Sequence, residues 1–594
     1  MPHHRSRPHR RSSRWLAVLA AVAISLAAPL PILTSDVAAA EATDPLQAAV
    51  ETYLAKNSGV TLGDCPTVGD VGSRCATIAV PKDWQNPGKG DLQVAIAYLR
   101  SDDPNAQLLT TNPGGPGVAG RYLTEQLSWT KPQVAQQYDL LGFDPRGYGA
   151  STRVRCLTTT AKYNKLPKVA DRRVRNKATH KVEVAEAKLF GEACGGDPNA
   201  RYINTQQTVW DLDFLRQLMA QYAGKTYDQL NYVGYSYGTW LGAWYADTFP
   251  SRVGKFILDS NMDWTSSMYA NQTLDPKAFQ RRRDKMLFPY LARHHSEFGL
   301  GKSASAVKKK YEATRKKLAA QAKKDLKKGK TPAIGPEDLD YTVSAYIELD
   351  SGFEPAGAVI EAAVYLAKHP SSSKARKTVA KRVKGPMTGA PFSVQRSAKA
   401  VSGSAQKDIS VGLAGAIVRC NDNVNSSNLT ALLKRADADA KKYPFLGYLN
   451  TIPQCAYWKY KPQTRTIDLA GVSNKILMFQ GEGDPATAYE GARTAHRRTA
   501  GTTVLVSVDN EGQHGLYIDG PSKCVDSLGD KFLFTAWKPT TDSTCTTGPL
   551  PFEKKVYPLA GPVSGASSTV KTAVKAKNSA VKAVRAEVAK RALS

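Results

Sequence analysis

The chain has 594 residues and a formal net charge of +29 at pH 7, long enough for one large catalytic domain with an insertion or for two or three ordinary domains. The basic residues are concentrated at the N-terminus, at 302–330, at 374–384 and in the C-terminal tail. None of these segments interleaves the aromatic residues on which single-stranded nucleic acids stack. We therefore expect solvated helix faces or attraction to an anionic cell surface, and no nucleic-acid partner.

The first 40 residues have the pattern of a secretory signal peptide. Five arginines precede an apolar run at 15–28, and three alanines at 38–40 offer a cleavage site before Glu41. The apolar run is too short for a comfortable membrane span, and no later segment qualifies. We expect the protein to be exported from the cell and secreted. Its basic tail could hold it at an anionic cell surface.

The eight cysteines are an even number, which in an exported protein indicates disulfides. Each neighbouring pair would close a loop of modest length. No Cys-x-x-Cys spacing occurs, so we expect no metal site and no cofactor. The expected pairs are Cys65–Cys75, Cys156–Cys194, Cys420–Cys455 and Cys524–Cys545.

Strand-like and helical patterns alternate along the first half of the chain. A parallel, doubly wound sheet with helices on both faces has this pattern, which predicts an α/β fold. The expected helices are 44–56, 205–223 and 239–249, with a polar insertion at 156–200, and the expected strands are 76–80, 92–99, 107–111, 139–143, 230–233 and 255–258.

The alternation stops near Asn261, and a lysine-rich helical pattern follows. It resumes with expected strands at 411–418, 475–479 and 503–508. Such an insertion lies over the carboxyl edge of the sheet, where sites of this fold class are found. We therefore predict a signal peptide (1–40), the first part of the α/β core (41–261), a helical cap (262–408), the second part of the core (409–560) and a basic Ala/Lys-rich tail (561–594).

Residues 230–249 predict a buried strand, a tight turn and a helix in direct succession, with Gly-x-Ser-x-Gly at the turn. This geometry holds the middle residue in a strained backbone conformation with its side chain exposed. Glycines two residues before and after it let the neighbouring chain approach. The helix start adds unpaired N–H groups and a partial positive charge. We predict that Ser236 is a nucleophile and not part of an ordinary turn.

A serine hydroxyl needs a base, and the base needs a carboxylate that fixes its tautomer. His514 lies in a glycine-flanked loop after the last predicted core strand, so we predict it as the base; His496 is expected on a solvated helix face. Asp484, in the glycine-rich loop after strand 475–479, is predicted to orient His514, with Glu482 as its rival. The order Ser236, Asp484, His514 is that expected of an α/β hydrolase.

A second glycine-rich turn, Asn-Pro-Gly-Gly-Pro-Gly at 112–117, follows the predicted strand 107–111. Its position suits one half of an oxyanion hole. Pro116 has no N–H, so we predict Gly114 or Gly115 as the donor, together with the N–H of Tyr237. One such donor stabilises the transition state by about 3 kcal/mol.

The chain carries five short motifs: Asn-Pro-Gly-Gly-Pro-Gly at 112–117, Asp-Pro-Arg-Gly-Tyr-Gly at 144–149, Gly-Tyr-Ser-Tyr-Gly-Thr-Trp-Leu-Gly at 234–242, Gly-Asp-Pro at 483–485 and Gly-Gln-His-Gly at 512–515. Together, these motifs resemble the secreted tripeptidyl aminopeptidases of actinomycetes, relatives of prolyl aminopeptidase with a characteristic C-terminal region. The resemblance covers roughly residues 45–552. It implies an α/β-hydrolase fold, the same Ser-His-Asp triad and release of short peptides, often tripeptides, from free N-termini. The chain departs from the family at Thr487-Ala488, where relatives tend to have Thr-Pro, and in its long basic cap.

An exopeptidase of this kind must recognise a free ammonium group, which calls for a carboxylate in a partly dry pocket. The candidates are Glu348, Asp350 and Glu354 in the cap, and Asp422 after Cys420. Two other functions fit the same sequence. A carboxylesterase would use the same triad, and a surface-attached binding protein could retain the scaffold without catalysis.

Overall fold

The computed structural model describes residues 45–65, 72–330, 334–370, 408–410, 414–424, 426–449 and 454–559, and the single residues 332, 372 and 377. All of them belong to one compact unit. The expected signal peptide, most of the interval 371–413 and the basic tail lie outside the described residues.

Ten strands form one sheet in the order β1-β2-β3-β5-β4-β7-β8-β10-β11-β12. The pairs from β1 to β5 along this order are antiparallel, and every later pair is parallel. The strands are β1 (Gly63–Asp64), β2 (Arg74–Pro81), β3 (Asp91–Leu99), β4 (Gln107–Asn112), β5 (Tyr138–Asp144), β7 (Leu230–Tyr235), β8 (Val253–Asp259), β10 (Ile476–Gly481), β11 (Thr503–Asp509) and β12 (Ser543–Thr546). β6 (Leu157–Thr159) and β9 (Asp408–Ser410) form a separate two-stranded sheet.

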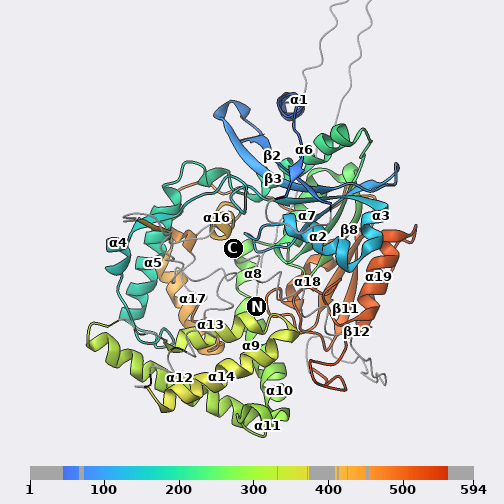
Figure 1. The fold of residues 1–594 in the computed structure, drawn as a ribbon. Coiled ribbons are helices and arrows are strands. Elements are labelled where there is room, and N and C mark those ends of the chain that lie inside the picture. The colour runs from blue at the N-terminus through green and yellow to red at the C-terminus, as the bar shows by residue number, and fades with distance from the viewer. Residues whose placement is uncertain are drawn as a thin grey trace, which may run out of the picture. The chain divides into compact units, whose positions relative to one another are not determined.

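Both faces of the sheet are buried, as the alternation of side chains along β8 shows. Phe256 and Leu258 belong to one hydrophobic core, and Ile257 belongs to another. Helices cover both cores, which confirms the predicted α/β class (Figure 1). The first core includes residues of α1 (Pro45–Lys56), α6 (Thr205–Ala223), α7 (Tyr237–Thr248) and α18 (Tyr489–Arg498), and the second includes residues of α2 (Arg121–Thr130), α3 (Pro132–Gln137) and α19 (Lys523–Phe534).

From α9 onward, the helices that follow β8 have a hydrophobic core of their own, while Met268 of α8 belongs to the first core of the sheet. Figure 1 shows α10, α11, α12 and α14 grouped together. We call the helices α8–α14 the cap. Phe445 and Leu559, which lie beyond these helices in the sequence, also belong to this core. The cap helices are α8 (Met268–Gln272), α9 (Asp275–Arg282), α10 (Phe288–Arg293), α11 (His295–Phe298), α12 (Ala304–Lys327), α13 (Pro336–Tyr346) and α14 (Phe353–Lys368).

The strand expected at 411–418 is wrong. Ala414–Asn421 form helix α16, followed by α17 (Leu429–Lys442), and residues 411–413 lie outside the described part. A short apolar run fits a buried strand and a buried helix equally well, so periodicity alone could not separate them. The insertion after Cys156 contains α4 (Thr160–Asn164) and α5 (Lys177–Gly195).

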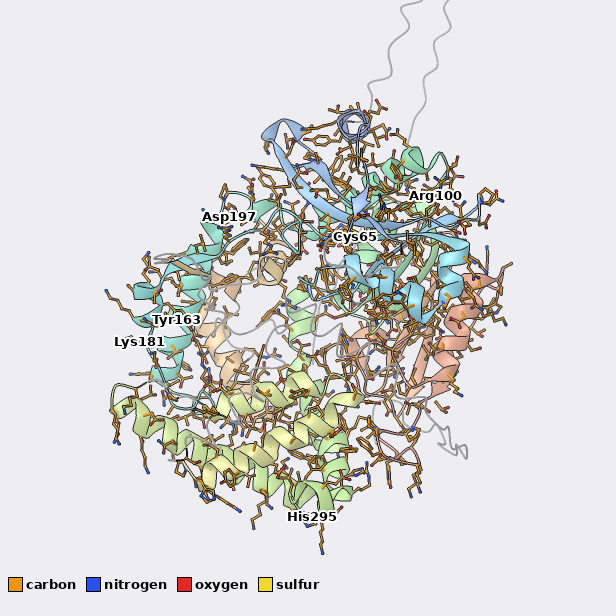
Figure 2. The ribbon with its side chains drawn as sticks, in the orientation of Figure 1. Cys65, Arg100, Tyr163, Lys181, Asp197 and His295 are labelled. Carbon is orange, nitrogen blue, oxygen red and sulfur yellow. A yellow bond between two sulfur atoms is a disulfide. The ribbon has the colours of Figure 1, made fainter. Side chains whose placement is uncertain are left out.

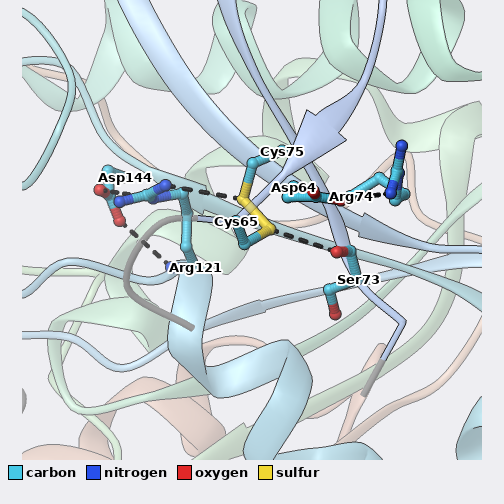
Figure 3. Close-up of a disulfide and its surroundings, with 7 residues drawn as sticks. All are labelled: Asp64, Cys65, Ser73, Arg74, Cys75, Arg121 and Asp144. Carbon is cyan, nitrogen blue, oxygen red and sulfur yellow. Dashed lines mark hydrogen bonds and ion pairs between the residues drawn. A yellow bond between two sulfur atoms is a disulfide. The ribbon is translucent and has the colours of Figure 1, made fainter. Parts of the chain in front are cut away.

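All four expected disulfides are present: Cys65–Cys75, Cys156–Cys194, Cys420–Cys455 and Cys524–Cys545. Figure 3 shows the first of them beside Arg121, whose Nε donates to Asp144 Oδ2 at 3.0 Å. Among the described residues, no helix combines the length and the apolar character needed to cross a membrane.

Candidate active site

Ser236 stands at the junction of β7 and α7 with φ 57° and ψ −122°. A positive φ in a residue with a side chain is strained, and such strain is concentrated at functional sites. The flanking glycines are required by close packing: a Cβ at Gly238 would lie 2.6 Å from the Asn112 carbonyl oxygen, and one at Gly234 would lie 2.4 Å from Tyr232 Cε1. Ser236 is only partly buried, and its positive φ is the strained conformation that the motif predicts.

His514 and Asp484 lie in contact. His514 Nδ1 is 3.1 Å from Asp484 Oδ1 and 3.0 Å from Oδ2. The hydroxyl of Thr487 donates to Asp484 Oδ2 at 2.8 Å. The rival carboxylate, Glu482, instead accepts the main-chain N–H of Asn510 at 2.9 Å. Of the two acids in the loop, Asp484 is therefore the partner of the histidine.

The electrostatics of this pair favour a charged imidazole. Burial alone would lower the pKa of His514, but the charges of Asp484, Glu348 and Asp259 outweigh it and raise that pKa to about 9. Burial would raise the pKa of Asp484, yet His514 and the hydrogen bonds from Thr487 lower it. Asp484 thus stays ionised and stabilises the imidazolium.

The loop of His514 lies against the Ser236 turn. Tyr235, which precedes Ser236, donates its hydroxyl to the Tyr517 carbonyl at 3.0 Å, and a Cβ on Gly515 would be 3.7 Å from the Tyr235 ring. Within the described residues, the Ser236 hydroxyl makes no hydrogen bond to His514. Catalytic hydrogen bonds are often long before substrate binds and shorten in the complex.

The turn at 112–117 also approaches the nucleophile. A Cβ on Gly114 would lie 2.8 Å from Ser236 Cβ and 3.0 Å from the Tyr237 nitrogen. The N–H of Gly114 already donates to Asn112 Oδ1 at 2.9 Å. Of the two predicted donors, the N–H of Gly114 is already hydrogen-bonded within its own turn. Gly115 is therefore the better candidate for the oxyanion-hole donor.

Helix α16, which sequence reasoning read as a strand, supports this turn. Arg419 Nη2 donates to the Gly115 carbonyl at 2.7 Å. A Cβ on Gly415 would lie 2.0 Å from the Pro116 carbonyl oxygen, so the helix and the turn are in backbone contact. Sequence reasoning missed this role of Arg419, because the contact joins segments roughly three hundred residues apart.

The four carboxylates considered for ammonium recognition occupy different surroundings. The main-chain carbonyl of Glu348 accepts the N–H of His514 at 2.7 Å. The Glu348 side chain is partly exposed. Burial of the carboxyl group raises the pKa of Glu348 to about 7, and the charged groups near it are His514 and Asp484. Glu348 is therefore the candidate that the structure brings to His514.

The other three carboxylates are engaged elsewhere or exposed. Asp350 pairs with buried Arg282 at 2.5 Å. Asp422 accepts the N–H of Thr205 at 3.0 Å, and burial raises the pKa of Asp422 to about 7. Glu354 is exposed.

Sequence reasoning did not single out Asp275, the first residue of α9. Burial raises its pKa well above the usual value for an aspartate, and its charged neighbours are Arg419, Asp484, Glu348 and His514. Asp275 precedes a proline at a helix start, where an acid looks like an ordinary dipole partner. Only the folded cap brings it toward the histidine.

The remaining described histidines lie elsewhere. His180 contacts Asp437 at 2.9 Å, and His295, labelled in Figure 2, accepts the N–H of Gly301 at 3.0 Å. The expectation that His496 is solvated is wrong: its side chain is 11% exposed and lies 2.8 Å from Asp542 Oδ2. None of these three contacts involves the Ser236 turn.

The sequence matches the α/β-hydrolase fold family at residues 109–336 and the family described as TAP-like protein at residues 443–545. The tripeptidyl aminopeptidase of Streptomyces coelicolor is 26% identical over 516 residues, covering 84% of this chain and 88% of that protein. The serine protease Hip1 of Mycobacterium tuberculosis is 32% identical over 215 residues, covering 35% of this chain and 40% of that protein. The chain is therefore a serine hydrolase of the α/β-hydrolase fold with a TAP-like segment, related to tripeptidyl aminopeptidases along most of its length.

Proposed function

We propose that the protein is an exported serine peptidase that releases short peptides, most readily tripeptides, from free N-termini. The observation that carries the proposal is the contact of His514 with Asp484 in a loop packed against the Ser236 turn. The relatives named tripeptidyl aminopeptidase and serine protease support the peptidase assignment. The four disulfides support export, since such bonds persist in oxidising surroundings.

In this mechanism the Ser236 hydroxyl attacks the scissile carbonyl while His514 accepts its proton. The carbonyl oxygen becomes an oxyanion, which the N–H groups of Gly115 and Tyr237 stabilise. His514 then gives the proton to the leaving amine, and the acyl-enzyme remains on Ser236. A water molecule deacylates the enzyme by the same steps, with Asp484 orienting the imidazole throughout.

Glu348 is our proposed anchor for the substrate ammonium. Its carboxylate is partly accessible, and His514 and Asp484 are its charged neighbours. Asp275 shares these neighbours; burial raises its pKa well above the usual value, and a bound ammonium group would favour its ionised form and so add a second negative charge. Two carboxylates held in partial burial favour an ammonium group over a neutral acylated amine. Asp350, Glu354 and Asp422 become weaker candidates because they are paired or exposed.

Substrate comparison tests this proposal. We expect tripeptide anilides with a free amino terminus to be hydrolysed far faster than their N-acetylated forms and faster than nitrophenyl esters of similar size. Turnover of the esters alone, at an ordinary enzymatic kcat/KM, would make the protein a carboxylesterase. A protein that a fluorophosphonate does not label at Ser236 would instead be a non-catalytic binding protein. S236A is the control for both assays.

A further inference from the structure

The carboxyl end of β8 contacts each of the three loops that carry the proposed triad. Asp259, Ser260 and Asn261 are all fully buried, with exposures of 0%. None of them takes part in the mechanism described above. Their hydrogen bonds nevertheless reach the turn of Ser236, the loop of Asp484 and the loop of His514.

Asp259 bonds to two of these loops at once. Its main-chain carbonyl accepts the N–H of Ser236 at 3.0 Å. Its carboxylate oxygen Oδ2 accepts the N–H groups of Leu516 at 2.9 Å and Tyr517 at 2.6 Å. A single residue thus joins the backbone of the nucleophile to the backbone just after His514.

The next two residues extend this connection. Ser260, with a φ of 58°, accepts the N–H of Gly515 on its hydroxyl oxygen at 2.7 Å. Asn261 donates its main-chain N–H to Gln480 Oε1 at 2.6 Å, and Gln480 Nε2 donates to the Thr487 carbonyl at 2.9 Å. Thr487 in turn bonds to Asp484.

We propose that Asp259 is a positioning residue for this triad: its hydrogen bonds set the separation of Ser236 and the His514 loop, and its carboxylate supplies a further negative charge to the imidazole beside those of Asp484 and Glu348. The role rests on the catalytic assignment of Ser236 and His514. It differs from that of Asp484 because Asp259 acts through the main chain and through space, without touching the ring.

The charges around the imidazole fit this role. Burial raises the pKa of Asp259 to about 7, against the opposing effect of its N–H donors, Ser260 and His514. Above that pH Asp259 is ionised while His514, with its raised pKa, still titrates. The other charged groups facing the ring are Asp484, Glu348 and, from α9, Asp275.

D259N separates charge from shape. An asparagine can keep its amide oxygen toward the N–H groups of Leu516 and Tyr517, while its amide nitrogen donates to Ser260. The measured quantity is the rate of fluorophosphonate labelling of Ser236 as a function of pH. The acid limb is the pH range over which the labelling rate rises as His514 loses its proton. We expect D259N to shift this limb to lower pH by about half to one unit, because the loss of one negative charge lowers the pKa of His514.

D259A removes both acceptor bonds and tests the positioning itself. We expect kcat to fall about 100-fold with KM within about threefold of wild type, because small displacements of reacting groups have effects of this size.

D139N is the matched control for D259N. Asp139 is also fully buried and accepts a main-chain N–H, from Ser101 at 2.7 Å, but it lies at the start of β5. We expect D139N to lower the melting temperature and leave the pH profile unchanged.

The outcomes separate this inference from the proposed function. A D259N profile that superimposes on wild type, or a folded D259A variant with kcat near wild type, would overturn the role of Asp259 alone. If D259A does not fold, the D259N profile decides. Absence of wild-type labelling would overturn the proposed function and this role with it.

Discussion

The main-chain N–H of His514 donates to the carbonyl oxygen of Glu348 at 2.7 Å. The base of the proposed triad and the proposed anchor of the substrate ammonium are thereby held together by one hydrogen bond. The cap residue that would select the substrate also helps to hold the residue that would perform the chemistry.

Replacing Glu348 by glutamine should impair recognition of the ammonium group. We expect E348Q to raise KM for tripeptide anilides by about 10- to 100-fold, since the enclosed ammonium group of the substrate would lose its charged partner. N-acetylated anilides and small esters should keep their KM. E354Q is the control, because Glu354 is an exposed carboxylate near the same part of the cap. Equal KM changes for free and acetylated substrates would contradict the assignment.

Replacing Asp484 by asparagine should abolish most turnover without unfolding the protein. The amide leaves the imidazole in the wrong tautomer and cannot stabilise the imidazolium, so we expect kcat to fall about 10⁴-fold. The measurement is steady-state hydrolysis of a tripeptide anilide. The S236A variant gives the residual rate without the nucleophile. An E482Q variant with kcat close to wild type would agree with Asp484 as the acid that orients His514. A large loss of kcat in E482Q, together with wild-type kcat in D484N, would assign that role to Glu482 instead.

Alanine at Gly114 should disturb the nucleophile turn. Its Cβ would lie 2.4 Å from the Tyr235 carbonyl oxygen, and the residue has a φ of +95°. We expect kcat to fall by at least about 100-fold, because the displaced turn would move the N–H of Gly115 away from the oxyanion. Gly59 offers the matched control, since nothing lies within 4 Å of an added Cβ. Wild-type kcat in a folded G114A variant would exclude a role for this turn.

The pH dependence should follow the raised pKa of His514. Below this pKa the ring already carries a proton and cannot accept one from Ser236. We therefore expect kcat/KM for a small nitrophenyl ester, which carries no titrating amino terminus, to rise with pH up to about pH 9, well above the value of about 6.5 for an unperturbed imidazole. E348Q should move this limb to lower pH because it removes a neighbouring negative charge. A rise of kcat/KM in the wild type with its midpoint near pH 6 would contradict the prediction.

Loss of the Cys420–Cys455 disulfide should reduce both stability and activity. The bond closes a loop with a sequence separation of 35, and opening it should lower the free energy of unfolding by about 3–4 kcal/mol. Because Arg419 of the same helix bonds to Gly115, we also expect kcat to fall. A C65S/C75S variant, which opens a shorter loop far from Arg419 in the sequence, should lose stability and retain kcat. Thermal unfolding and steady-state kinetics measure the two effects.

The sequence was informative where local chemistry determines structure. The strand–turn–helix around Ser236 requires its glycines for steric reasons, so its motif predicts its geometry. The core strands are buried on both faces, and their apolar runs predicted β7, β8, β10 and β11 closely. The same signal failed for 411–418, since α16 is also an apolar run buried against its neighbours.

The surroundings of His514 could not be predicted in this way. Asp275 and Arg419 approach the site only through folding of the cap and of α16, and nothing in their local sequences indicates it. Likewise, Glu348 differs from Glu354 by its neighbours in space and not by its residue type. His496 occupies a helix whose polar pattern suggested solvent, but Asp542 from a later segment covers it.

The bond between Glu348 and His514 bears on how such enzymes diversify. A lid attached only at its hinges could be exchanged between homologues to alter selectivity without affecting turnover. In this chain a graft that replaced the cap would also have to supply an acceptor for the His514 N–H. Engineered chimaeras should therefore transfer the segment around Glu348 together with the loop it supports.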